Sequence, residues 1–399
     1  MAETKPKHVL IFSFVYYPRY IGGAEVAVKE ITDRISVSEI EFDLIALRID
    51  KNLPKFERIG NVNVHRVGFV GSQKQSSDSL PWYLHVNKYL YPFFSRAKAK
   101  ALQKTRDYSA TWAIMANYSG FGALFFKSAR PDIPFILTLQ EGDPIDYIKK
   151  RVRFVYPLFK KIFADADIIQ TISNYLADFA REMGGKNIVV VPNGVDVVKF
   201  SAEISQSEIS AVKEVIGKKQ DDIFLVTASR LVVKNAVSDI VKALKFLPEN
   251  VKLLVCGTGY EEKNLRALVE KLSLGGRVVF KGFVSQNDLP KYLRACEVFV
   301  RPSLSEGFGN SFIEAMAARI PVVATSVGGI VDFLEDKKTG LFCAVSEPKD
   351  LAKKVEIYMR DVFLREEIID NAFEMVKEKY DWNLVASDMR EKVFQKILL

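Results

Sequence analysis

The chain has 399 residues, of which 48% are hydrophobic and 27% are charged, a composition typical of folded globular proteins. These values exclude a disordered chain, a collagen and a coiled-coil rod, and the length favours two or three domains. Cys256, Cys296 and Cys343 are too scattered for a disulfide framework. Because no apolar run is long enough to span a membrane and no signal-peptide cleavage site follows Met1, we expect a cytoplasmic protein that is not integral to a membrane.

The net charge of +8 is concentrated in the first half of the chain. Residues 1–200 contain 28 basic and 20 acidic residues, whereas residues 201–399 contain 29 of each. The first half could therefore attract nucleic acid, acidic lipid or phosphorylated substrates. No zinc-finger or RNA-recognition signature is present, which argues against nucleic acid as a partner.

Short apolar runs alternate with helical patterns from end to end, which indicates parallel sheets built from βαβ units. In the first half, we predict strands near 8–15, 42–48, 62–67, 111–116, 134–139, 167–172 and 188–191, and helices near 24–36, 82–105, 119–129, 147–163 and 174–183. In the second half, we predict strands near 223–228, 251–256, 277–281, 296–301, 321–325 and 340–343, and helices near 236–246, 259–273, 286–293, 311–318 and 348–360.

Pro, Asn and Gly interrupt this alternation from Pro192 to about Ser201, which indicates a linker. Open α/β sheets bind ligands beyond the carboxyl ends of their strands. Two sheets joined by one linker would therefore direct both sets of loops into a cleft.

Two of the loops after predicted strands carry glycines or cations. Gly22 and Gly23 precede a predicted helix, so an anion or a sugar could approach the backbone there, although a tight turn without a ligand explains them equally well. Arg230 and Lys234 follow strand 223–228 and suit a diphosphate, because Arg offers a fork of donors and Lys a point charge. Alone, such a pair is more often solvated surface charge.

The richest loop runs from Arg301 to Ala317, between strand 296–301 and a helix whose cap we expect near Asn310 or Ser311. Free N–H groups at that helix start suit an anion. Glu306 and Glu314 could accept hydrogen bonds from sugar or ribose hydroxyls; the alternative is a simple cap with surface glutamates. A fourth loop, Thr325 to Ile330, again places glycines between a strand and a helix. Four such loops argue together against a purely structural explanation.

These motifs resemble glycosyltransferase family 4, the group 1 glycosyl transferases. The resemblance covers nearly the whole chain and rests on Pro192-Asn193-Gly194-Val195-Asp196, the Arg230/Lys234 pair, Gly257-Thr258-Gly259, Lys281-Gly282-Phe283-Val284, Pro302-Ser303, Glu306-Gly307-Phe308-Gly309, Glu314-Ala315-Met316-Ala317, Pro321-Val322-Val323-Ala324 and Gly328-Gly329. The two glutamates have the spacing E-x7-E.

The resemblance implies the α/β fold called GT-B, with two Rossmann-like doubly wound domains that face a cleft. It implies an N-terminal acceptor-binding domain (1–198), a C-terminal nucleotide-sugar-binding domain (199–378) and a C-terminal helix (379–399) that returns to the N-terminal domain. The implied activity is a retaining transfer of a hexose-type sugar from a UDP-, GDP- or ADP-linked donor to a glycan, lipid-linked or polysaccharide acceptor.

The resemblance also implies roles for individual residues. Arg230 and Lys234 would clamp the diphosphate and, with Glu306 facing the transferred sugar, form the catalytic set. Glu314 would accept from the ribose hydroxyls. The other implied donor contacts are Gly22, Gly23, Gly307, Phe308, Gly309, Asn310 and Ser311. We expect no catalytic metal and no cofactor besides the nucleotide-sugar co-substrate, since cations can offset the charge on the departing diphosphate. The Asp-x-Asp at 165–167 is interpreted as structural.

The chain departs from the family pattern at three places. Many relatives have a histidine after the strand that corresponds to 134–139, but His8, His65 and His85 all lie elsewhere. Gln140 or Glu141 would contact the sugar or the acceptor instead. Arg319 stands where relatives usually have glycine, and the Arg230-to-Lys234 spacing is shorter than in many relatives.

The basic excess includes two aromatic stretches. Residues 147–163 contain six cations and no acids, and residues 82–106 have a similar mixture of aromatics and cations. We hypothesise peripheral binding to an anionic inner membrane surface, with access to a lipid-linked glycan. The alternative is a pair of amphipathic helices that pack their aromatics into the first domain.

Other activities are compatible with the same fold. A nucleotide-sugar epimerase and a non-catalytic nucleotide- or sugar-binding subunit of a glycosylation complex remain alternatives. An α-glucan phosphorylase would need a lysine that carries pyridoxal phosphate, which the sequence does not reveal. A dinucleotide-dependent dehydrogenase is disfavoured because the first strand lacks a GxGxxG turn.

Overall fold

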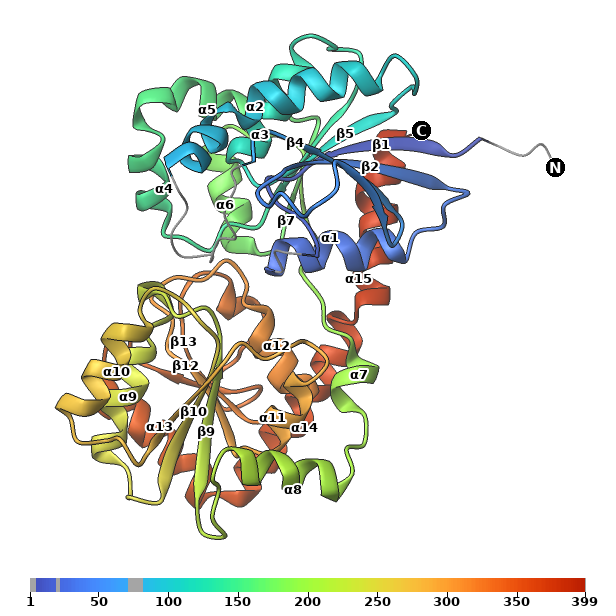
Figure 1. Ribbon diagram of the computed structural model, residues 1–399. Helices are drawn as coiled ribbons and strands as arrows, with labels where there is room; N and C mark the ends of the chain where they lie inside the picture. Colours follow the sequence, from blue (N-terminus) through green and yellow to red (C-terminus); the bar gives the residue numbers. More distant parts are fainter. Residues whose placement is uncertain (1–4, 19–21, 71–81, 399) are drawn as a thin grey trace. The chain divides into compact units, whose positions relative to one another are not determined.

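The computed structural model describes residues 5–18, 22–70 and 82–398 (Figure 1). The chain divides into two compact units: unit 1 comprises Met1–Asn193 and Trp382–Leu399, and unit 2 comprises Gly194–Asp381. The sequence placed the corresponding boundaries at 198/199 and 378/379. None of the described helices is both long enough and apolar enough to cross a membrane.

Within the described residues, unit 1 has an eight-stranded sheet in the order β3-β4-β2-β1-β5-β6-β7-β8. The pairs are parallel except for β3 with β4, where a short antiparallel edge strand is added. The sequence did not predict β3. The strands are β1 (Lys7–Phe12), β2 (Ile40–Leu47), β3 (Phe56–Ile59), β4 (Val62–Val67), β5 (Ala110–Ile114), β6 (Phe135–Leu139), β7 (Ile168–Thr171) and β8 (Ile188–Val190).

The central strands of unit 1 are continuous apolar runs, because helices cover both faces of a parallel sheet. In β1, for example, the side chains from Val9 to Phe12 are fully buried. The helices are α1 (Gly23–Asp33), α2 (Trp82–Leu102), α3 (Tyr118–Lys127), α4 (Ile145–Arg151), a 3-10 turn (Arg153–Val155), α5 (Tyr156–Ala164), α6 (Asn174–Glu182), α15 (Trp382–Met389), a π-helical segment (Arg390–Phe394) and α16 (Gln395–Leu398).

The single helix expected over 147–163 is instead two helices, α4 and α5, joined by a 3-10 turn. The break precedes Pro157, which lies in the first turn of α5. Proline is well tolerated there, because the first N–H groups of a helix have no intrahelical partner.

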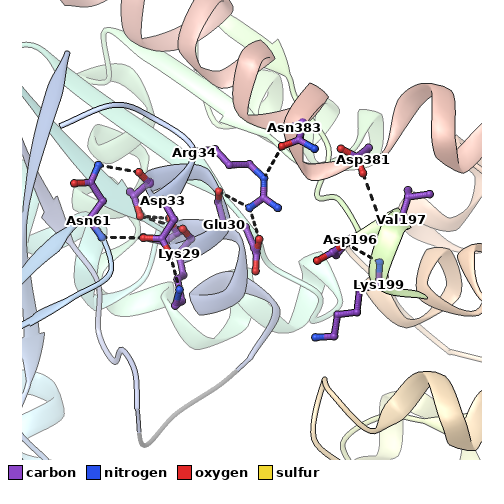
Figure 2. A network of polar contacts seen from close by, with 12 residues as sticks. Lys29, Glu30, Asp33, Arg34, Asn61, Asp196, Val197, Lys199, Asp381 and Asn383 are labelled. Atoms are coloured by element: carbon purple, nitrogen blue, oxygen red, sulfur yellow. Dashed lines mark hydrogen bonds and ion pairs between the residues drawn. The ribbon is translucent and has the colours of Figure 1, made fainter. Parts of the chain in front are cut away.

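The C-terminal helical segment packs on the sheet of unit 1, which confirms the expected return of the C-terminal helix. The ring of Phe394 lies 5.2 Å from that of Trp112 in β5 and 5.9 Å from that of Phe42 in β2. Figure 2 shows Arg34, the C-cap of α1, donating to Asn383; the two atoms lie 3.1 Å apart. The last helical residues therefore complete the hydrophobic core of unit 1.

Within the described residues, unit 2 has a six-stranded parallel sheet in the order β11-β10-β9-β12-β13-β14. The strands are β9 (Ile223–Ala228), β10 (Val251–Cys256), β11 (Val278–Gly282), β12 (Val298–Arg301), β13 (Val322–Thr325) and β14 (Leu341–Cys343). The sequence predicted each of these strands within a few residues. The three cysteines are buried free thiols.

The helices of unit 2 are α7 (Val197–Ser201), α8 (Gln206–Val215), α9 (Val237–Ala243), α10 (Glu262–Lys271), α11 (Leu289–Arg294), α12 (Asn310–Ala317), α13 (Pro348–Arg360) and α14 (Val362–Lys379), with 3-10 turns at Val233–Asn235, Leu244–Phe246 and Gly328–Asp332. The sequence reading omitted α7, α8 and α14. At the start of unit 2, the Val195 N–H donates to the Tyr380 carbonyl at 2.8 Å. The Val197 N–H donates to Asp381 at 3.4 Å (Figure 2). The first and last segments of the unit are thus joined.

Candidate active site

The loop after β9 carries the two cations predicted to clamp a diphosphate. Arg230 is exposed and Lys234 is half-buried, in a 3-10 turn. The buried side chain of Asn235 donates to the Arg230 carbonyl at 2.7 Å, and the Lys234 carbonyl accepts from the Leu304 N–H at 2.7 Å. The cation loop is therefore internally fixed and directly joined to the loop after β12.

The loop after β10 packs against the same cation loop, backbone to backbone. Leu231 N–H donates to the Thr258 carbonyl at 2.8 Å. A Cβ atom at Gly257 would overlap the Ser229 carbonyl, and one at Gly259 would overlap that of Leu231. Glycine is required at both positions because no side chain fits between the loops.

The loop after β12 contains a buried ion pair between Arg301 and Glu306. The same guanidinium donates to Asn235 Oδ1 at 3.1 Å and to Ser311 Oγ at 2.8 Å, and it lies 5.2 Å from the centroid of the Phe312 ring. Glu306 also accepts from the Gly307 N–H at 3.1 Å. This cluster links the β9 loop, the β12 loop and the start of α12.

The sequence analysis gave no role to Arg301 or Asn235, although Arg301 begins the richest loop that it described. One signal was available: a charged residue that ends a buried strand requires a partner, and a glutamate follows five residues later. The contact with Asn235 joins residues 66 positions apart, and no local pattern indicates it.

The start of α12 differs from the expected cap. The N-cap is Gly309 in the left-handed region (φ 97°), with no side-chain cap, whereas the sequence placed the cap near Asn310 or Ser311. A Cβ atom at Gly309 would press on the Phe312 ring. The Phe312 N–H donates to the Gly309 carbonyl at 3.0 Å. The positive end of the helix dipole, without a side-chain cap, suits an anion.

Gly307, Phe308 and Gly309 are all buried. The Phe308 ring packs against Phe333 and Tyr380, with centroids 5.2 and 5.5 Å away. Phe308 therefore belongs to the core by its side chain, and only its backbone remains for donor binding.

The loop after β13 contacts Glu306 through the backbone. Gly329 N–H donates to the Glu306 carbonyl at 3.1 Å. Gly328 has φ 55°, and a Cβ atom there would overlap the same carbonyl oxygen. The fourth glycine loop of the sequence analysis thus fixes the main chain of Glu306.

Glu314 lies buried on α12 and accepts from Gln286 Nε2 at 3.1 Å. Burial raises its pKa to about 7, against the lowering effects of that hydrogen bond and of the charges on Lys199 and Arg301. The carboxyl group is thus poised between its two protonation states near neutral pH.

The remaining predicted residues belong to unit 1. Gly22 is the N-cap of α1, and its N–H donates to Glu25 at 2.9 Å; Gly22 and Gly23 are exposed. Gln140 forms a reciprocal amide pair with Asn193, at 3.1 and 3.0 Å.

Glu141 is buried in the loop after β6, and its two oxygens accept from the N–H groups of Ala116 (2.7 Å) and Gln140 (2.9 Å). Burial raises its pKa to about 7. Its visible partners are backbone groups, so it fixes the loops after β5 and β6.

Among the described residues, no group of three His, Cys, Asp or Glu side chains could hold a metal ion. The Asp-x-Asp at 165–167 has structural partners. Asp165 pairs with Lys161, and Asp167 accepts from Lys127 at 2.9 Å and from the Phe135 N–H at 2.7 Å.

Comparison with known proteins agrees with this geometry. Residues 208–375 match the family model described as "Glycosyl transferases group 1", and residues 21–199 match that of "Glycosyltransferase Family 4". The two matches together span most of the chain. The protein is therefore a glycosyltransferase and belongs to the group 1, family 4 glycosyltransferases.

Several curated proteins are similar to the chain. It is 25% identical to an uncharacterised glycosyltransferase of Methanocaldococcus jannaschii, over 95% of this chain and 96% of that protein. It is 27% identical to the putative teichuronic acid biosynthesis glycosyltransferase TuaC of Bacillus subtilis, over 65% of this chain and 64% of that protein. It is 29% identical to the N,N'-diacetylbacillosaminyl-diphospho-undecaprenol alpha-1,3-N-acetylgalactosaminyltransferase of Campylobacter jejuni, over 67% and 71%.

Solved structures confirm the GT-B fold. Sucrose-phosphate synthase from Thermosynechococcus elongatus matches with a TM-score of 0.83 at 20% identity, over 98% of this chain and 99% of that one. Anabaena HepE, in complex with UDP-glucose, matches with a TM-score of 0.78 at 19% identity, over 97% and 99%.

Proposed function

We propose that the protein is a metal-independent retaining glycosyltransferase that takes a hexose-type sugar from a nucleotide diphosphate sugar. The observation that carries this proposal is the direct bond between two loops, from Leu304 N–H to the Lys234 carbonyl. This bond joins the loop that carries Arg230 and Lys234 to the loop that carries Glu306 and leads to the uncapped start of α12. Two cations, a helix start without a side-chain cap and a carboxylate thus come from adjacent strand ends of one sheet.

In the proposed reaction, the bond between the anomeric carbon and the phosphate oxygen breaks, and a bond to the acceptor oxygen forms on the same face of the sugar. Arg230, Lys234 and the start of α12 would stabilise the negative charge that grows on the departing diphosphate. The proton of the acceptor hydroxyl would pass to the departing phosphate oxygen. Glu306 would accept hydrogen bonds from the hydroxyls of the transferred sugar, and Glu314 from the ribose.

The acceptor is proposed to be a glycan, a lipid-linked saccharide or a growing polysaccharide. Teichuronic acid and a diphospho-undecaprenol saccharide appear in the names of two relatives described above, which favours this class. UDP, GDP and ADP remain the candidate donor nucleotides; one structural neighbour contains UDP-glucose.

We further propose that the enzyme works at the cytoplasmic face of a membrane, through the region of α4 and the following 3-10 turn. Phe154 is 83% exposed, and Tyr147 and Val155 are also exposed. Arg153 lies over the Phe154 ring at 4.4 Å. In α2, the Tyr91 side chain is instead fully buried and bonded to two carbonyls, and the side chains of Trp82 and Tyr83 lie outside the described residues. The membrane hypothesis therefore rests mainly on the α4 region.

Thermal unfolding tests the donor proposal. A ligand at 100 times its Kd stabilises a fold by about 2.7 kcal/mol. We expect the unfolding temperature to rise with one of UDP, GDP or ADP and with its sugar conjugate. Arg230→Ala should abolish the rise, whereas Lys271→Ala, at the exposed end of α10, should keep it. No rise with any nucleotide would contradict the proposal.

Product analysis tests the reaction itself. NMR of the glycoside should show the anomeric configuration of the donor, and an inverted configuration would exclude retention. Flotation on phosphatidylcholine vesicles with and without phosphatidylglycerol tests the membrane proposal. Failure to float with either composition would contradict it.

A further inference from the structure

The aromatic ring of Tyr118 lies at the carboxyl edge of the sheet in unit 1. Tyr118 is the first residue of α3 and follows β5, after the N-cap Asn117. Its ring packs 5.4 Å from that of Phe14, which follows β1. The carboxyl edge is where open α/β sheets bind ligands, and Gln140 and Glu141 lie at the same edge, after β6.

Two cations from different helices meet on this ring. Lys88 of α2 places its Nζ 5.4 Å from the ring centroid. Arg151, the last residue of α4, places its Cζ 6.0 Å from the centroid and donates from Nη2 to the Tyr118 hydroxyl at 3.3 Å. Tyr89, which is 66% exposed, meets the ring edge to face at 5.7 Å.

The described part of the chain gives these two cations no carboxylate partner. Neither Lys88 nor Arg151 is in an ion pair there, whereas Lys149 of the same α4 pairs with Glu182. The hydrogen bond to Glu182 raises the pKa of Lys149, and the charge of Asp146 of α4 contributes a smaller part of that rise. Partial burial, and then the charge of Arg151, lower the pKa of Lys88.

Two like charges beside one partly buried ring repel each other, and the ring compensates only in part. An anion between them would remove the repulsion and use both kinds of donor. A phosphate is the anion that the fork of an arginine and the point charge of a lysine bind best together.

We propose that Lys88, Arg151 and Tyr118 form a subsite for the phosphate or diphosphate of a phosphorylated acceptor. The exposed ring of Tyr89 and the partly buried ring of Tyr118 offer an amphipathic surface to the adjoining sugar. This inference rests on the proposed function, because it names the chemical class of the acceptor. It involves unit 1 only, whereas the proposed donor clamp, Arg230 and Lys234, belongs to unit 2.

Inorganic pyrophosphate is the probe for this subsite, in protein that carries Arg230→Ala to weaken the donor clamp. Isothermal titration should show binding in that background. Adding Lys88→Gln or Arg151→Gln should each weaken the Kd about tenfold, since each removes a charge-assisted contact. Lys150→Gln is the matched control, because it removes the neighbouring exposed charge of α4 and should leave the Kd within about twofold.

Circular dichroism and the unfolding temperature without ligand confirm that the variants fold. Absence of pyrophosphate binding in the Arg230→Ala protein would overturn the subsite, as would equal weakening by Lys150→Gln. Neither result bears on the proposed binding of the nucleotide-sugar donor, which is tested in protein that retains Arg230. If pyrophosphate fails to bind and Lys88→Gln and Lys150→Gln reduce vesicle flotation equally, the cations serve a membrane surface and the subsite is wrong.

Discussion

The carboxylate of Glu306 is held in an ion pair by the guanidinium of Arg301, and both side chains are only 10% exposed. The same guanidinium bonds Asn235 and Ser311, so one cation joins two loops and a helix start. A buried carboxylate remains charged only when it is paired and hydrogen-bonded. Arg301 therefore positions the residue that we place against the transferred sugar.

Arg301→Met should destabilise the protein by about 3–5 kcal/mol, because it leaves Glu306 buried without its partner. Sugar transfer should be lost as well. The free energy of unfolding from urea titration measures the first effect. The double variant Arg301→Met with Glu306→Gln should recover most of the stability but none of the transfer. Recovery of transfer in the double variant would show that this ion pair is only structural.

Because Gly328 lies against the Glu306 carbonyl, replacing Gly328 should lower the free energy of unfolding more than replacing a glycine without such a contact. Gly328→Ala would place a methyl group on that oxygen and would also strain a residue with φ 55°. Gly217 provides the matched control, since it has φ 69° and no atom within 4 Å of the place that an added methyl group would take. We expect Gly217→Ala to cost about 1 kcal/mol from backbone strain alone and Gly328→Ala to cost clearly more, as measured by urea unfolding. If the two variants lost the same free energy of unfolding, the close contact between Gly328 and the Glu306 carbonyl would be contradicted.

The raised pKa of Glu314 predicts how stability depends on pH. The pKa is about 7 in the folded protein, against an ordinary value of 4.5. Between these values the unfolded chain has released its proton while the folded chain retains it, so this group lowers stability as the pH rises. Above pH 7 the ionised Glu314 lowers the free energy of unfolding by its full amount, at most roughly 3 kcal/mol.

The variant Glu314→Gln keeps a side-chain oxygen that can accept the hydrogen bond from Gln286, and it removes the negative charge. The variant should therefore gain stability over the wild type at about pH 8 and gain little at about pH 5. Urea unfolding at both pH values measures this difference. Glu141 has the same raised pKa, so part of the wild-type pH dependence should remain in the variant. If Glu314→Gln gained the same stability at both pH values, the raised pKa of Glu314 would be contradicted.

The sequence predicted the strands well because each buried strand is a short apolar run between turn residues. It missed α8, although Ser205 and Glu208 form a capping box there and S-x-x-E is a sequence signature of a helix start. It missed the roles of Arg301 and Asn235 for a different reason. Their importance comes from contacts between loops distant in sequence, which only the folded chain brings together.

Arg319 also became interpretable only in the structure. It has φ 58°, a conformation that glycine adopts without strain, which gives a physical reason for the glycine that the family resemblance leads us to expect there. Here the guanidinium lies 4.2 Å from the centroid of the Phe373 ring and pairs with Asp370 at 2.7 Å. These contacts with α14 offset part of the strain.

Replacing Arg319 separates the strain from the contacts. Arg319→Gly loses an exposed ion pair and a cation–π contact, each worth up to about 1 kcal/mol, but it relieves about 1–2 kcal/mol of backbone strain. Arg319→Ala loses the same contacts and keeps the strain. Even after the extra entropy of glycine in the unfolded chain is counted, the glycine variant should be the more stable of the two, and close to the wild type, in urea unfolding. If Arg319→Ala is instead the more stable variant, the left-handed backbone conformation at this position is not strained by the amount that we expect.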